Sequence, residues 1–294
     1  MSRRRGQAIS PPATGPRAPA PDLALHAPPA ADTMAPARLA GSPAADAATP
    51  MKRPRAIRIV DDAAGPRARP PAGSARLGVD LPVFDQTVRI VADVPDRPLR
   101  MSDAVPLARE VCDRVVAAAI RHGEAVGEPV SCSRGCSACC ETPVLISAPE
   151  AFRLIADIAS QAGDRGRRVK AALAAAEKRL AAPGPPAHAC PLLAGHVCTI
   201  RAFRPCVCRA FLATSPPELC DTRERRVMPL SVDVPLALRR WAAELDDDAS
   251  GPVLLSAVVS WSGENRARGR RTWPGPHMVR RLFDALSATA QESP

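Results

Sequence analysis

Cysteine is the residue type in this chain whose number and spacing point most clearly to chemistry. The chain has ten cysteines in 294 residues, and nine of them lie between Cys132 and Cys220. Cys132, Cys136, Cys139 and Cys140 place four thiols within nine residues. Thiolates are soft ligands suited to Zn(II), Cu(I) and iron–sulfur clusters, and four of them complete a tetrahedral zinc site or hold a [4Fe–4S] cluster. The spacing therefore predicts a cysteine-ligated metal centre.

The adjacent pair Cys139 and Cys140 restricts how this loop can bind metal. Neighbouring side chains are hard to direct at one ion, so one of the two is expected to belong to a second site or to bridge two metals. A second group of cysteines follows at Cys190, Cys198, Cys206, Cys208 and Cys220. The first loop is therefore predicted to be one half of a shared centre that closes when residues 190–220 fold back onto it.

The two segments together resemble the YkgJ-type cysteine-cluster family of bacterial proteins, from about Cys132 to Cys220. The shared motifs are Cys-x3-Cys-x2-Cys-Cys, Cys-Pro-Leu-Leu, Cys-x-Ile and Arg-Pro-x-x-Cys-Arg. That family is described as a zinc- or iron-chelating domain. The resemblance implies eight metal ligands, enough for two four-thiolate sites: Cys132, Cys136, Cys139, Cys140, Cys190, Cys198, Cys208 and Cys220. Cys206 falls on a variable position of the last motif and is interpreted as a spare thiol.

Charged and imidazole side chains stand close to the cysteines. A four-thiolate site with Zn(II) or an oxidised [4Fe–4S] cluster carries net negative charge and gains from nearby cations and N–H donors. Arg204 and Arg209, which belong to the last motif, are predicted to supply them, whereas Arg134 is interpreted as a solvated arginine. His188 and His196 each stand two residues before a cysteine and are interpreted as loop residues, with ligation to a mixed site as the alternative.

The composition limits the classes of partner. The net charge is +10, aromatic residues are 3% of the chain and tyrosine is absent, so no stacking platform for single-stranded nucleic acid is expected. The four arginines between Arg266 and Arg271, near Trp273, motivate an alternative: a basic nucleic-acid-binding protein with a structural zinc site. Charge alone attracts phosphates without specificity, and we consider nucleic acid an unlikely partner. The expected partner is a metal ion or cluster, and no feature indicates a particular protein partner.

The sequence also indicates a compartment. No apolar run approaches the length of about 20 residues that spans a bilayer, so no membrane association is expected. The basic start Met1–Arg5 is not followed by the apolar segment of an export signal. A cytoplasmic location follows, and in a reducing compartment a dense cysteine cluster favours metal over disulfides.

No catalytic constellation is identifiable. Neither a Ser/His/Asp arrangement, nor paired carboxylates, nor a phosphate-binding loop can be assigned, so whether the chain is an enzyme stays open. Electron transfer or metal handling is the expected role. Flagellin lysine methylases are similar in carrying this type of cysteine-rich domain, which leaves a lysine N-methylase-like activity as an alternative. The spacing Cys132-x3-Cys136-x2-Cys139 also resembles radical S-adenosylmethionine enzymes, but Ala138 stands where an aromatic residue is usual.

The positioning elements are expected to be mainly helical, with a small α+β arrangement as the alternative. Residues 1–78 are rich in Pro, Ala, Arg and Gly and predict a disordered tail. Residues 79–294 predict a single domain with the cysteine-cluster core at 131–221. Cys112 lies in an apolar helical stripe, so we expect it to pack in the core rather than bind metal.

Periodicity and capping signals predict the elements of this domain. One strand or hairpin arm is expected within 81–94. A helix is expected to begin at Ser147, where Ser147 and Glu150 form a capping box, and to end near Gly163. Other helices are expected from Ser102 or Asp103 to about 123, from Asp164 to Pro183, over 235–245 and over 276–290. The apolar run 253–259 fits either a strand or a buried helix.

Overall fold

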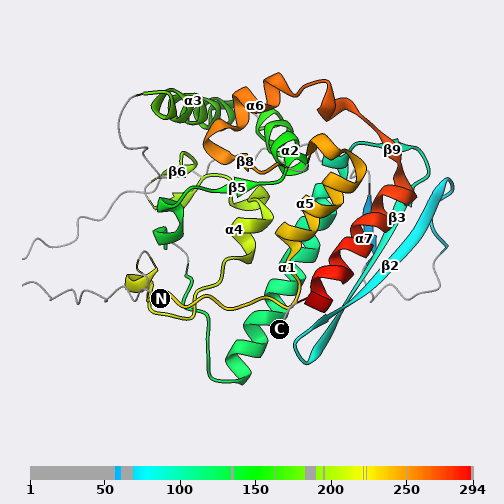
Figure 1. Cartoon of the computed structure of the whole chain (residues 1–294), viewed down its shortest axis with the longest axis horizontal. Helices are drawn as coiled ribbons and strands as arrows, with labels where there is room; N and C mark the ends of the chain where they lie inside the picture. The colour runs from blue at the N-terminus through cyan, green and yellow to red at the C-terminus, as the bar shows by residue number, and fades with distance from the viewer. Residues whose placement is uncertain are drawn as a thin grey trace, which may run out of the picture. The chain divides into compact units, whose positions relative to one another are not determined.

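The structure is a computed structural model, and it describes residues 57–60, 69–133, 136–161, 163–182, 190–194, 196–220, 222, 224–249 and 251–292. This part of the chain is mainly helical and carries small antiparallel sheets, which confirms the predicted class in its coarse form (Figure 1). Residues 1–56 and 61–68, where the tail was predicted to be disordered, lie outside the described residues.

A three-stranded antiparallel sheet opens the described chain. It contains β1 (Arg58–Val60), β2 (Ser74–Val83) and β3 (Gln86–Pro95), with β3 in the centre. A two-residue turn joins β2 to β3, and Phe84 adopts a positive φ of 54° there. The Phe84 ring stacks on the His122 ring with centroids 4.1 Å apart, which fixes the hairpin tip to the first long helix.

The sheet begins earlier than the boundary at residue 79 that the sequence predicted. β1 and the first five residues of β2 fall within the stretch expected to be unstructured. Arg76 pairs across the sheet with the buried Asp93 at 2.8 Å. Glycine and arginine in this stretch weaken the strand pattern, and the ion pair that stabilises the strand joins residues 17 positions apart, so the local sequence does not reveal it.

Three long helices pack with this hairpin: α1 (Met101–Ala125), α5 (Val234–Leu245) and α7 (Gly275–Glu292). In Figure 1, α7 runs along β2 and beside α5. Trp241 of α5 is fully buried, and its indole N–H donates to the carbonyl oxygen of Met278 in α7 at 2.9 Å. The helices predicted over 235–245 and 276–290 are confirmed, with both ends within two residues of the predicted positions. The ends of α1 lie within two or three residues of the predicted positions.

A second layer lies over the opposite side of α1 and holds α2 (Ala148–Ala159), α3 (Gly163–Leu180) and α6 (Val258–Glu264). The capping box of Ser147 and Glu150 is confirmed, and α2 ends four residues before Gly163. The run 253–259 was predicted to be either a strand or a buried helix, and it contains a strand followed by the start of a helix. It begins with β8 (Val253–Leu254), which pairs with β5 (Leu145–Ile146), and its end enters α6.

Short elements complete the described chain. They are β4 (Pro98–Leu99), β6 (Leu193–Ala194), β7 (Val197–Cys198), β9 (Trp273–Pro274), α4 (Cys206–Ala210) and 3-10 turns at Ala138–Glu141, Arg201–Phe203, Pro217–Leu219, Asp247–Ala249, Leu255–Ala257 and Arg268–Arg270. Within the described residues, no helix combines the length and apolar character needed to cross a bilayer.

Candidate metal centre

The first cysteine segment leaves α1 and is fixed to residues 211–215. The backbone N–H of Ser131 donates to the carbonyl oxygen of Ala213 at 2.8 Å, and its hydroxyl donates to the same oxygen at 3.0 Å. The thiol sulfur of Cys132 accepts the backbone N–H of Ala213 at 3.3 Å. The first thiol of the loop is therefore held against a segment that lies about 80 residues later in the chain.

A direct backbone bond joins the two cysteine segments. The N–H of Cys190 donates to the carbonyl oxygen of Cys140 at 2.7 Å. Close by, the Ser137 hydroxyl and the His196 Nδ1 atom lie 2.9 Å apart. His196 has a φ of 62° in the turn between β6 and β7, and Cys198 ends β7. The second segment thus folds back onto the first, as the sequence predicted, and His196 contributes to that contact.

The short helix α4 carries two cysteines with different environments. The N–H of Cys206 donates to Glu150 Oε1 at 2.7 Å, and Cys206 is fully buried. The Cys112 thiol donates to the Cys206 carbonyl oxygen at 3.6 Å. A hydrogen bond to Cys112, burial and the charge of Glu150 raise the pKa of the Cys206 thiol. Cys208 lies two positions further on, which is about 200° around an α-helix, so it leaves the opposite side.

Cys112 and Cys206 therefore form a buried contact between α1 and α4, away from the other cysteines. The core position predicted for Cys112 is confirmed by its complete burial. The structure also places Cys206 outside the groups of thiols described next. Sequence reasoning recognised Glu150 as a helix cap and missed its bond to α4, because the two partners are 56 residues apart and no local pattern links them.

Four thiols make up what we call the first thiol group: Cys132, Cys136, Cys139 and Cys220. The pKa of Cys132 is raised by burial and by electrostatic interaction with the neighbouring cysteines Cys139 and Cys136. The pKa of Cys220 is raised by burial and by Cys136, Cys132 and Cys139. Like charges raise one another's pKa values only at short range. These shifts therefore indicate that the four sulfurs share one neighbourhood.

The second thiol group consists of Cys140, Cys190, Cys198 and Cys208. Burial raises the pKa of Cys208 to about 12, with further contributions from Cys190, Cys198 and Cys139. Burial also raises the pKa of Cys190, followed by the charges of Cys198 and Cys139. The hydrogen bond with Cys139 lowers the pKa of Cys140 overall, whereas the charges of the three other members of the second group act in the opposite direction. This group joins the end of the first loop to the hairpin β6–β7 and to α4.

Cys139 and Cys140 lie where the two thiol groups meet. A hydrogen bond between their side chains raises the pKa of Cys139 and lowers that of Cys140. Cys139 influences members of both groups, whereas Cys140 is influenced only by Cys139 and by the second group. Cys139 therefore has neighbours in both thiol groups, and the division of the pair between two metal sites stays a prediction.

The two arginines of the last motif have different positions. The charge of Arg204 lowers the pKa values of Cys132, Cys139 and Cys208, so its guanidinium lies near both thiol groups. Its Nε atom is buried and has no hydrogen-bond partner among the described residues. An unpaired N–H group beside thiols is suited to a site that gains negative charge.

Arg209 instead fixes the loop to α1. It donates to both carboxylate oxygens of Asp113 at 2.7 and 2.6 Å, and also to the carbonyl oxygens of Arg204 and Ala202. None of these bonds reaches a thiol, so they do not support the predicted role of Arg209 beside the metal. Arg134 and His188 lie outside the described residues.

The thiols are close without forming a finished coordination site. All ten cysteines are free. Among the described residues, no three His, Cys, Asp or Glu side chains converge tightly enough to hold a metal ion. The donor set nevertheless fits a thiophilic metal in type and number, because two groups of four thiols are gathered beside the buried Arg204 Nε.

The basic run near Trp273 is partly neutralised. Arg268 lies 3.3 Å from Asp248, and Arg271 lies 2.7 Å from Asp246. These ion pairs remove part of the charge that motivated the nucleic-acid alternative, and Arg268 also donates to Asn265 within the same turn.

Comparisons with protein-family models, with curated proteins and with solved structures find no match to this chain. The resemblance to the YkgJ-type family therefore rests on the cysteine motifs, and function must be argued from the thiol geometry.

Proposed function

We propose that this protein binds a thiophilic metal, as Zn(II) or as an iron–sulfur cluster, through two four-thiolate sites. The observation that carries the proposal is the 2.7 Å backbone hydrogen bond from the Cys190 N–H to the Cys140 carbonyl oxygen, which brings the two cysteine segments together. Cys139 belongs to the first site and Cys140 to the second. This assignment gives each thiol group four ligands, the number that a structural zinc or a [4Fe–4S] cluster takes.

Arg204 supports both sites in this proposal. Four thiolates around a divalent cation leave a net charge of about −2, which is costly to bury without compensation. The guanidinium of Arg204 acts on thiols of both groups, and its buried Nε has no other partner among the described residues. Arg204 is therefore the cation that offsets the thiolate charge, whereas Arg209 holds the loop in place.

The biological role that fits these features is electron transfer or metal handling in a reducing compartment. Ten free thiols are compatible with such a compartment. The YkgJ-type motifs support the same reading, because that family is described as zinc- or iron-chelating.

Elemental analysis with a visible spectrum of anaerobically purified full-length protein tests the proposal. Two filled zinc sites give about two zinc ions per chain and no colour. Iron with acid-labile sulfide and a broad absorption near ~400 nm identify iron–sulfur clusters. Folded protein that contains neither metal, and takes up neither on reconstitution, refutes the proposal.

Two cysteine variants provide a matched comparison. Cys208→Ser removes a member of the second thiol group and is expected to lower metal content and stability together, because metal binding is coupled to folding of the site. Cys112→Ala removes a buried cysteine outside both groups and is expected to keep full metal content. Equal metal loss in both variants would show that the metal loss reports general unfolding.

A further inference from the structure

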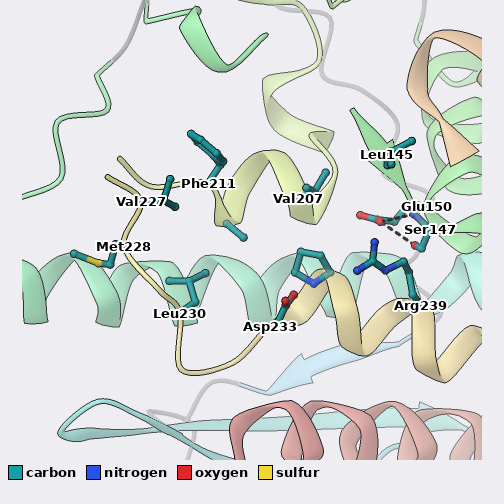
Figure 2. A pocket seen from close by; sticks show the side chains of 12 residues that line it. Leu145, Ser147, Glu150, Val207, Phe211, Val227, Met228, Leu230, Asp233 and Arg239 are labelled. Atoms are coloured by element: carbon teal, nitrogen blue, oxygen red, sulfur yellow. Dashed lines mark hydrogen bonds between the residues drawn. The ribbon is translucent and has the colours of Figure 1, made fainter. Parts of the chain in front are cut away.

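A cavity lies beside α4 and is lined by Val207 and Ala210 of that helix. Its volume is about 290 Å³, close to the lower end of the range for small-molecule sites. The wall is formed mostly by apolar side chains from α4, from the strand segment before α2, from residues 227–230 and from the start of α5 (Figure 2). Among the apolar lining residues are Val207, Phe211, Met228 and Leu230.

Apolar surface is exposed at this cavity. Leu145 and Val227 line it and are 47% and 42% exposed, and both belong to the small set of exposed large hydrophobic side chains in the described chain. Phe211 is held in place by Arg225, whose guanidinium carbon lies 5.1 Å from the ring centroid. The cavity therefore presents a hydrophobic surface that a ligand with a hydrocarbon part would cover.

The two carboxylates of the wall already have hydrogen-bond donors. Glu150 accepts from the Ser147 N–H at 3.2 Å, from the Ser147 hydroxyl at 2.8 Å and from the Cys206 N–H at 2.7 Å. Asp233 caps α5 by accepting the N–H of Leu236 at 2.8 Å. Both carboxylates therefore stabilise the wall through hydrogen bonds within the protein, and neither needs a cationic ligand as a partner.

Arg239 differs from them. It is half-buried, and in Figure 2 its guanidinium reaches up from α5 toward the end of the cavity where Ser147 and Glu150 lie. It has no hydrogen bond or ion pair with any other residue that the structure describes. The next residue, Arg240, faces elsewhere and binds both carboxylate oxygens of Glu292 at 2.7 Å. The cavity thus combines apolar walls and two hydrogen-bonded carboxylates with one guanidinium that makes no hydrogen bond or ion pair among the described residues.

We propose that this cavity binds a small organic monocarboxylate, with Arg239 holding the carboxylate and the apolar wall covering a short hydrocarbon body. The guanidinium fork matches a carboxylate with two parallel hydrogen bonds. Glu150 and Asp233 oppose negative charge in the cavity, so only the carboxylate that pairs with Arg239 is accommodated and a ligand with a second carboxylate is disfavoured. No cysteine lines the cavity, although Val207 stands next to Cys208 in α4.

Binding of a series of straight-chain carboxylates, from acetate to octanoate, to the full-length protein tests this proposal. Calorimetric titration is expected to show affinity rising about three- to fourfold for each added methylene until the cavity is filled. The corresponding primary alcohols and amines are expected to bind at least about tenfold more weakly, because they lack the charge that pairs with Arg239. Each bound carboxylate should also raise the melting temperature.

Variants on α5 separate this site from nonspecific uptake. Arg239→Gln is expected to weaken carboxylate binding about tenfold or more, and Arg239→Lys to weaken it less. Arg240→Gln removes an equal charge from the neighbouring position and is expected to leave binding unchanged. The proposal is overturned if no carboxylate binds, if alcohols or amines bind as well as carboxylates, or if Arg239→Gln and Arg240→Gln behave alike.

Discussion

Two regions of the molecule are built in different ways. The packed half consists of the hairpin β2–β3 and helices α1, α5 and α7, and its interior is apolar and fully buried, as Leu81, Ile90 and Trp241 show. The cysteine half, residues 131–142 and 190–226, contains among its described residues only single turns, two-residue strands and the five-residue helix α4. In Figure 1 it lies at the end of the molecule away from the hairpin.

The difference shows what each half needs for stability. Buried apolar area stabilises the packed half without any added group. Short turns bury too little surface to offset the entropy of ordering the chain, and such regions usually depend on disulfides or metal. The cysteine half has free thiols and no long element, so we expect metal to contribute there what hydrophobic packing contributes in the other half.

The largest loss of stability is expected from Trp241→Ala in the packed half. The side chain is fully buried, and its indole N–H donates to the carbonyl oxygen of Met278, which joins α5 to α7. Removing it leaves a large cavity and deletes this hydrogen bond, which costs about 3–5 kcal/mol in the free energy of unfolding. Urea denaturation measures this loss. Trp261→Ala, at a half-buried tryptophan that packs on Phe152, is the control and should cost less. Metal loss from folded Trp241→Ala protein would contradict the separation of the two halves.

Substitutions in the two thiol groups are expected to change metal content more than overall stability. Cys220→Ser affects the first group and Cys198→Ser the second, so each variant should lose about half of the metal and the double variant nearly all of it. Elemental analysis gives the content, and hydrogen exchange shows where protection falls. Protection should decrease in residues 131–142 and 190–226 and persist in α5 and α7. If either single variant loses all metal, the eight thiols form one centre.

Much of the helical structure was readable from sequence because its signals are local. The capping box at Ser147 and the apolar periodicity of α7 place helix ends within a few residues. The early strands were missed because β2 is stabilised by pairing with β3 and by the bond from Arg76 to Asp93, neither of which a local pattern encodes.

One part of the candidate site could likewise be predicted from local sequence motifs, whereas another part depends on contacts between residues that are distant in the chain. The cysteine motifs predict eight thiol ligands and the adjacent Cys139 and Cys140 imply more than one site; metal binding by these thiols stays a prediction. The position of α4 was not predictable, because it depends on contacts with Glu150 and with Asp113 that are 56 and 96 residues distant. The same contacts show why two arginines from one motif, Arg204 and Arg209, have different surroundings.

Glu150→Gln is expected to have an intermediate effect that extends into both halves. Glu150 is buried and joins the cap of α2 to the first N–H group of α4. The amide group of glutamine would face the N–H of Ser147 with a donor, leaving buried groups unpaired at a cost of about 1–3 kcal/mol. Denaturant unfolding measures this loss, and metal content should fall because α4 carries Cys208. Glu177→Gln on the exposed surface of α3, where the carboxylate accepts from Val259 and Ser260, should leave metal content unchanged.

The smallest effect is expected at the hairpin tip, far from the cysteines. A hydrogen bond from its own backbone, followed by one from His122, lowers the pKa of Asp85. A carboxyl whose pKa is lowered by folding stabilises the protein above its unfolded pKa of about 4, and the contribution is lost as the pH falls through the folded value.

Urea midpoints measured between pH 6 and pH 3 (roughly the range over which a carboxyl titrates) test this expectation. Asp85→Asn should flatten the acid-side decline slightly relative to the wild type, because the variant has no carboxylate to protonate. Glu124→Gln, at an exposed carboxylate in the last turn of α1, is the control. The metal content of Asp85→Asn should equal that of the wild type, since the change lies in the packed half. A shifted metal content would mean that the hairpin tip and the thiol groups are coupled through α1, which begins at the sheet and leads into the first cysteine segment.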